Sequence, residues 1–333
     1  MRQSAPKPLL PAPVNWWGPT AIKLFQRCKN CSTTKNFMRA TGKRQTLLAT
    51  AKLANALLPS YASDFEAAML FQFLKHRRLI ATLAANELRT RYMGTFAGLL
   101  WNFISPLVMA LIYWFIFSTI FYAGRVIYEG YELQYICYFL AGYAPWLLFQ
   151  ETVLRSANAI ADNPNYVKKI VFPLGTLAFI HFLAGSISHL VILGVLLAIM
   201  LSSGISVSPE IFLIIPYYLL LALFTLGISW VISAINVFVR DAAHVVALVL
   251  NVWFWFCPIV WVMSAMPEKF RFVFALNPFL FFIDGYRGAL FSNLAPQSPG
   301  GGLPVIYVMI VFAVFFVGQY IFQRLQSHFG DMV

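Results

Sequence analysis

The chain has 333 residues, of which 60% are hydrophobic and 11% are charged, and its formal net charge is +12. Soluble globular domains carry about 25% charged residues, so this composition excludes an ordinary soluble enzyme and is typical of a protein with several membrane spans. More than half of the Lys and Arg residues lie at or before Arg91. A basic arm can bind nucleic acid. Because an uncharged segment directly follows this one, we expect no nucleic-acid partner and a cytoplasmic amino terminus, as the positive-inside rule predicts.

Residues 1–60 are basic and rich in proline near their start. They lack sustained periodicity and a signal-peptide pattern, and we interpret them as a disordered cytoplasmic tail. Cys28 and Cys31 form a CxxC pair within it. A zinc site needs two further Cys or His ligands at suitable spacing, and none are near, so we expect incidental thiols and no metal.

Residues 61–92 are predicted to form an amphipathic helix. Ser63 and Glu66 have the spacing of a capping box, and apolar residues at a spacing of four precede a basic block at Lys75–Arg78. This pattern indicates a helix on the inner membrane surface. A soluble helix that packs on a partner is the alternative.

Residues 93–333 contain apolar stretches that are separated by polar turns. A helix needs about 20 apolar residues to cross a bilayer. The predicted spans are Phe96–Phe121, Tyr135–Val153, Ile170–Leu201, Ile211–Val239, His244–Met263 and Leu303–Phe322. We therefore expect an all-α polytopic protein of the cytoplasmic (inner) membrane, with six transmembrane helices and both termini in the cytoplasm.

The interval between the last two predicted spans, Met266–Gly300, is apolar but interrupted by Pro278, Asp284 and Arg287. It is too interrupted to span and too apolar for a solvated loop, which predicts a re-entrant helical hairpin. Asp284 and Arg287 have the i,i+3 spacing of a structural pair. A catalytic Asp284 is the alternative, and it would make the chain a membrane-bound enzyme of glycan assembly.

The sequence contains no GxxxxGK[ST], HExxH or GxSxG motif. We therefore expect no catalytic residues and no cofactor in this chain. Ion-coupled transporters place ionisable groups inside their spans, whereas these spans are nearly free of charge. His181 and His189 lie in the third span and are interpreted as packing residues, which disfavours an ion-driven transporter.

Aromatic residues make up 17% of the chain. Many are explained by core packing and by the aromatic belts at membrane interfaces. The alternative is a conduit in which aromatic rings meet the apolar faces of sugars. The candidates for this path are Trp101, Tyr113, Tyr138, Tyr143, Trp146, Trp253 and Trp255.

Two polar turns on the side of the termini could contact a partner. The first follows the second span and contains Asn163, Pro164, Asn165, Tyr166, Lys168 and Lys169. We interpret it as a basic projection that docks in a partner's groove, although a basic loop that only sets topology has the same pattern. Arg240 and Asp241 form the second, smaller turn.

Four parts of the sequence carry a family resemblance. They are ELRTRYMGTFAGLLWNFISPL, NPNYVKKIVFPLGTL, VFVRDAAHVVALVLNVWFWFCPIVW together with NPFLFFIDGYRGALF, and YIFQRLQSHFGDMV. In combination they resemble the permease subunit of type-2 ABC exporters that move capsule, O-antigen and teichoic acid polysaccharides. The resemblance covers about Ser63 to Val333.

The resemblance implies a homodimer with two copies of a separate ATPase, which binds ATP and Mg²⁺, and a lipid-linked polysaccharide as cargo. Asn163–Lys169 would be the coupling helix, Ser63–Arg91 the interface helix, and the first, second and fifth spans the walls of the path. Arg89, Arg91 and Gly94 would then lie where a substrate headgroup arrives, or against membrane phosphates. Export of another cargo, a drug or a lipid, is the alternative.

Overall fold

The computed structural model describes residues 77–90, 100–120, 125–128, 131–163, 174–263, 266–291 and 303–332. The chain divides into two compact units, Met1–Phe71 and Gln72–Val333. All described residues belong to the second unit, so the predicted tail and the first part of the predicted interface helix lie outside them.

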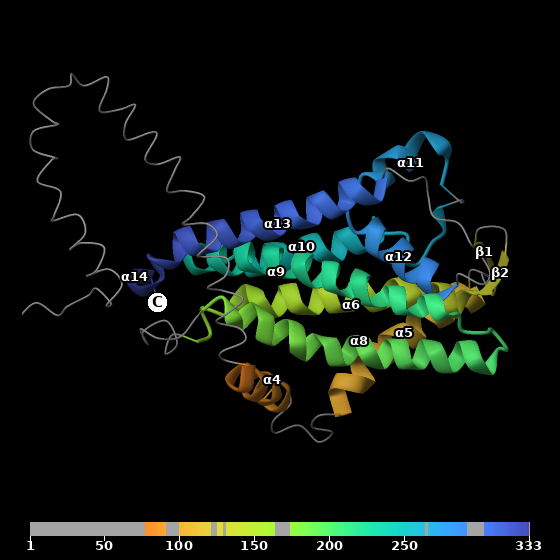
Figure 1. Cartoon of the computed structure of the whole chain (residues 1–333), viewed down its shortest axis with the longest axis horizontal. Helices are drawn as coiled ribbons and strands as arrows, with labels where there is room; N and C mark the ends of the chain where they lie inside the picture. The colour runs from red at the N-terminus through yellow and green to blue at the C-terminus, as the bar shows by residue number, and fades with distance from the viewer. Residues whose placement is uncertain are drawn as a thin grey trace, which may run out of the picture. The chain divides into compact units, whose positions relative to one another are not determined.

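The described part of the second unit is almost entirely helical (Figure 1). Its longer helices are α4 (Arg77–Thr90), α5 (Trp101–Phe115), α6 (Tyr135–Asn158), α8 (Thr176–Ser202), α9 (Ile214–Phe238), α10 (Ala242–Trp255) and α13 (Leu303–Gln326). The shorter helices are η2 (Ile116–Ile120), η3 (Pro209–Leu213), α11 (Glu268–Ala275), α12 (Leu280–Leu290) and α14 (Phe329–Met332).

Helix α6 lies at the centre of the described unit. It packs against α8 and α9 and also contacts α5, α10 and α12, while α13 lies along the outer side of α9 (Figure 1). Most of its side chains are buried, among them Trp146 and Phe149. Helix α4 packs on α8. The other helices therefore bury α6.

Four helical segments in the described part of the chain are long and apolar enough to cross a membrane. They are Phe103–Ile120, Thr176–Ser202, Pro209–Phe238 and Val305–Gln326. In each of these four segments, less than half of the most apolar stretch is buried within the chain. Apolar side chains are therefore left to face lipid or other protein surfaces. Helix α6 is not among these four, and α10 is shorter.

The predicted end of the fifth apolar helix is wrong. The sequence predicts a helix from His244 to Met263, whereas α10 ends at Trp255 and the chain then turns. Pro258 explains the early end, because proline has no backbone N–H and disfavours the helical conformation of the residue before it.

A β-hairpin joins η2 to α6, where the sequence indicates only a polar interval. Strands β1 (Arg125–Tyr128) and β2 (Tyr131–Gln134) pair antiparallel. An exposed ion pair connects them, with 2.6 Å between Arg125 Nη1 and Glu132 Oε2. Val126 and Leu133 are buried. The hairpin therefore covers the start of α6.

Two glycines allow α9 and α13 to approach each other closely. A Cβ at Gly318 would overlap the carbonyl oxygen of Gly227, and a Cβ at Gly227 would lie 2.6 Å from the carbonyl oxygen of Val314. Small residues at such crossings let helix backbones touch, which is a common basis of helix packing in membranes.

We predict that Gly318→Ala lowers the thermal unfolding midpoint of the detergent-solubilised protein. The added methyl group must separate two backbones, and overpacking of this kind costs about 1–3 kcal/mol. Gly194→Ala is the matched control, because Gly194 lies within α8 and has no atom within 4 Å of an added Cβ. Equal midpoints for the two variants would contradict close packing of α9 on α13.

Candidate functional site

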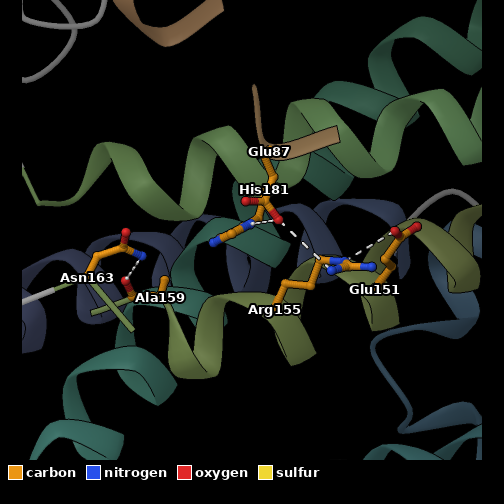
Figure 2. A network of polar contacts seen from close by, with 6 residues as sticks. All are labelled: Glu87, Glu151, Arg155, Ala159, Asn163 and His181. Carbon is orange, nitrogen blue, oxygen red and sulfur yellow. Dashed lines mark hydrogen bonds and ion pairs between the residues drawn. The ribbon is translucent and has the colours of Figure 1, made fainter. Parts of the chain in front are cut away.

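The first predicted contact turn begins directly after α6. Asn163 is its first predicted residue, and its Nδ2 donates to the carbonyl oxygen of Ala159 at 2.9 Å (Figure 2). The remaining predicted residues, Pro164, Asn165, Tyr166, Lys168 and Lys169, lie outside the described residues. What the structure describes are the two ends of this segment.

Helix α9 holds both ends of the undescribed segment 164–173. On the near side, Asn236 Nδ2 donates to Asn158 Oδ1 at 3.0 Å, and Asn158 is the last residue of α6. On the far side, the buried Trp230 indole donates to the carbonyl oxygen of Gly175 at 2.9 Å. The segment therefore leaves from and returns to positions fixed on one helix.

The second predicted contact turn lies between α9 and α10. Arg240 and Asp241 are both exposed. The backbone N–H groups of His244 and Val245 donate to the carbonyl oxygen of Asp241, which closes the turn. Ala243 N donates to Asn236 Oδ1 at 3.1 Å. Asn236 thus contacts the end of α6 and the start of α10, which lie beside the two contact turns.

A polar junction of Glu87, Glu151, Arg155 and His181 joins α4, α6 and α8 (Figure 2). Glu87 Oε1 lies 3.9 Å from Arg155 Nη1 and 3.4 Å from His181 Nδ1. Arg155 Nε lies 3.4 Å from Glu151 Oε1. The side chains are 10–34% exposed. Because α4 contributes Glu87, its ion pair with Arg155 and its contact with His181 link α4 to α6 and α8, the two helices that flank the first contact turn.

A shallow groove of about 220 Å³ lies beside this junction. Its polar lining comes from Glu151 and Arg155 of the junction and from Ser105, Tyr143 and Ser188. The groove connects the junction to the surface of α5. Of the residues predicted to meet a substrate headgroup, Arg91 and Gly94 lie outside the described residues. Arg89 lies within α4, where only its backbone is described.

Arg287 is 1% exposed and lies in α12. Its Nη2 donates to the carbonyl oxygens of Pro258 at 2.8 Å, Ile259 at 3.4 Å and Tyr138 at 3.3 Å. The guanidinium also lies over the Tyr138 ring, with Cζ 3.5 Å from its centroid. Arg287 therefore binds backbone carbonyls, a role that the sequence does not predict. Its predicted i,i+3 pair with Asp284 stays a prediction.

Two tyrosines of α6 complete the same cluster. Tyr135 OH donates to the carbonyl oxygen of Val260 at 2.9 Å, and Tyr138 OH donates to that of Trp261 at 3.1 Å. With Arg287, these side chains satisfy four consecutive carbonyls, residues 258–261, in the turn after α10. An unpaired backbone group away from water is costly, so the cluster permits helix α10 to end where it does.

The seven aromatic residues predicted for a path separate into three groups by their burial. Tyr138, Tyr143 and Trp146 are at most 6% exposed and pack inside the chain, where Trp146 meets the edge of the Trp253 ring. Tyr113 and Trp253 are partly buried, and Trp101 and Trp255 are exposed. The buried group therefore builds the core of the chain, and the exposed pair remains available to a path.

The described residues contain no group of three His, Cys, Asp or Glu side chains that could hold a metal ion. The geometry at the contact turns and the polar junction is suited to transmitting movement between helices. Sequence reasoning missed Glu87, Asn158 and Asn236 as members of this end of the bundle. Their type and spacing carry no signal, because each acts through a partner that is distant in sequence.

The chain belongs to the ABC-2 type transporter family, whose pattern matches residues 78–291. It is 24% identical over 265 residues to the O-antigen export system permease protein RfbA of Myxococcus xanthus, covering 79% of this chain and 98% of that protein. It is 28% identical over 260 residues to RfbA of Klebsiella pneumoniae, covering 77% and 95%. The capsule polysaccharide export inner-membrane protein CtrC of Neisseria meningitidis serogroup B is 27% identical over 163 residues, covering 48% and 58%.

We predict that Arg287→Met lowers the thermal unfolding midpoint in detergent strongly, because each buried carbonyl that loses its donor costs about 1–3 kcal/mol. Arg287→Lys should be intermediate, since lysine keeps the charge but lacks the planar fork. Arg324→Met, at an exposed position in the last turn of α13, should leave the midpoint unchanged. A wild-type midpoint for Arg287→Met would refute the structural role of this guanidinium.

We also predict that Glu87→Gln loosens α4. An ion pair between partly exposed groups contributes about 0.2–1 kcal/mol, so loss of the Glu87–Arg155 pair should raise amide hydrogen exchange in α4 by up to about fivefold. Mass spectrometry of peptides from Arg77–Thr90 measures this rate. Glu210→Gln, an exposed acid in η3, is the control. Unchanged exchange in α4 would mean that apolar packing on α8 alone holds the helix.

Proposed function

We propose that this chain is the permease subunit of an ATP-driven exporter that moves a lipid-linked polysaccharide across the inner membrane. The observation that carries the proposal is the alignment with the two RfbA permeases over at least 95% of their lengths. The partial match to CtrC supports a polysaccharide cargo as well. Membership of the ABC-2 type transporter family supports an ABC ATPase as the partner.

The proposed topology has six transmembrane helices and both termini in the cytoplasm. In this arrangement α5 with η2, α6, α8, α9, α10 and α13 would be the spans. Helix α4 would be the described part of an interface helix at the inner membrane surface, and α11 and α12 would form the re-entrant hairpin. The contact turns and the polar junction would then face the cytoplasm, where an ATPase is accessible.

The proposed assembly has two permease chains and two ATPases. Exposed apolar side chains along α5 and α10, such as Leu111 and Leu248, support a surface that a second copy covers. A groove of about 380 Å³, lined by Leu248, Val249, Val252, Trp253 and Phe256, belongs to the same face of α10. The exposed Trp101 and Trp255 are our candidates for stacking on sugar rings in the path between the two chains.

In the proposed mechanism the ATPase binds ATP and Mg²⁺ and closes as a dimer. The basic segment Asn163–Lys169 sits in a groove of the ATPase and moves with it. Because both ends of this segment are held by α9, the movement reaches the helix pair α6 and α9 directly. Through Arg155 it also reaches α4, which lies beside the proposed route of the lipid headgroup.

We predict that the double variant Lys168→Glu/Lys169→Glu loses most of the ATPase from affinity-purified permease and abolishes surface polysaccharide. Reversal of two charges on a docking segment replaces attraction with repulsion at the interface. The measurements are the ATPase:permease ratio after purification from membranes and the amount of polysaccharide at the cell surface in a strain that depends on this gene.

Lys269→Glu is the matched control, because Lys269 is an exposed lysine of α11, in the proposed outward-facing hairpin. It should retain both the ATPase and the export. If the double variant keeps a wild-type ATPase ratio and normal export, the segment Asn163–Lys169 is not the coupling helix. If the ATPase is retained in every variant and polysaccharide export never depends on this chain, the proposed cargo is wrong.

A further inference from the structure

Both the oxygen and the nitrogen of the Asn236 side-chain amide make hydrogen bonds. It is 3% exposed and lies in the last turn of α9. Its Oδ1 accepts from Ala243 N, and its Nδ2 donates to Asn158 Oδ1. A backbone N–H can only donate, so the bond from Ala243 fixes which end of the Asn236 amide is the oxygen. Nδ2 must then face Asn158, and Asn158 must present its oxygen.

The two bonds lead to the two contact turns. Ala243 lies in the first turn of α10, two residues after Asp241, and its bond to Asn236 satisfies one of the free N–H groups at that helix start. Asn158 ends α6, and its backbone carbonyl accepts from Asp162 N at 2.9 Å within the next turn of chain. Asn236 therefore connects the end of α6, beside the first contact turn, to the start of α10, beside the second.

We propose that Asn236 is a positioning residue that makes the end of α6 and the start of α10 move as one unit. The inference rests on the proposed function in one respect, namely that the ATPase delivers movement to these turns. Movement applied to the segment after α6 is passed through Asn158 and Asn236 to the start of α10. Helix α10 carries the exposed apolar face and Trp255. Helices α6 and α10, two of the proposed walls of the path, would therefore respond together when the ATPase docks.

Carboxylate substitutions separate this role from simple folding. Asn158→Asp keeps an acceptor for Asn236 Nδ2. Asn236→Asp keeps the acceptor for Ala243 N, and a flipped Asn158 amide can donate to the new carboxylate. The double variant Asn158→Asp/Asn236→Asp places two carboxylates, both acceptors only, against each other and breaks the connection. Each single variant should thus behave like wild type, and the double variant should not.

A distance measurement tests the connection directly. Spin labels are attached at Asp162→Cys and His244→Cys, two exposed positions on either side of the connection. Cys28 and Cys31 are replaced by serine, and Cys137 and Cys257 stay because they are fully buried. Labelled chain is diluted with unlabelled chain, so that pulsed EPR reports the distance within one copy.

We expect a single narrow distance in the wild type and in both single variants, first in the permease alone and then in the complex with its ATPase. Addition of a non-hydrolysable ATP analogue should leave that distance unchanged, because the turns move together. In the double variant the distribution should broaden, and the analogue should shift it. Polysaccharide exported per ATP hydrolysed should fall about fivefold, the change in an equilibrium that loss of one typical hydrogen bond produces.

Asn158→Ala gives a second way to break the connection, because Asn158 is exposed at the end of α6 and its truncation should not prevent folding. It should broaden the distance as the double variant does. A narrow wild-type distance in both broken variants overturns the proposal, as does a single variant as broad as the double one. If the permease alone broadens as expected but the ATPase fails to associate with any form, the connection stands and the proposed ATPase coupling fails.

Discussion

The structure depends on one constraint, which is that backbone polar groups buried away from water must find partners inside the protein. The turn after α10 meets this constraint with side chains. Arg287 and two tyrosines of α6 donate to four consecutive carbonyls, so the chain can leave its helix early and form α11 and α12. A Cβ at Gly142 would lie 2.9 Å from Arg287 Nη2, so α6 also supplies the space that the guanidinium occupies. The early end of α10 therefore depends on Arg287 together with the α6 residues that bond the turn and leave space for the guanidinium.

Side-chain hydrogen bonds also hold the opposite end of α6. There, Asn236 and Trp230 of α9 hold the chain on either side of the first contact turn, and the ion pair of Arg155 with Glu87 holds α4. The partly exposed ion pair contributes little, so α4 can rearrange without unfolding the core, whereas the buried Asn236 and Trp230 keep the chain beside the first contact turn on α9. In the proposed mechanism, a rigid break at one end and an adjustable junction at the other end suit a helix that transmits movement.

The sequence alone predicts the features that depend on local composition and on short motifs. Apolar length located the long helices, and the quoted motifs indicated the transporter family, which the family match to residues 78–291 confirmed. Contacts between distant residues could not be predicted. Asn236 and Asn158 are 78 positions apart, and Arg287 and Tyr138 are 149 apart. The end of α10 was missed because apolar residues continue past Trp255, so hydropathy outweighed the signal of Pro258.

The roles of the aromatic residues could not be predicted either, because they also depend on contacts between residues that are distant in sequence. Composition alone cannot separate rings that pack from rings that face a path, and the fold separates them by burial. Tyr138 and Trp146 are enclosed by α10 and α12, whereas Trp101 and Trp255 are exposed on helices whose apolar faces lack cover within the described chain. A path that needs sugar-binding rings must draw on that second group. In the assembly that we propose, such a path lies outside the fold of a single chain, where two copies meet.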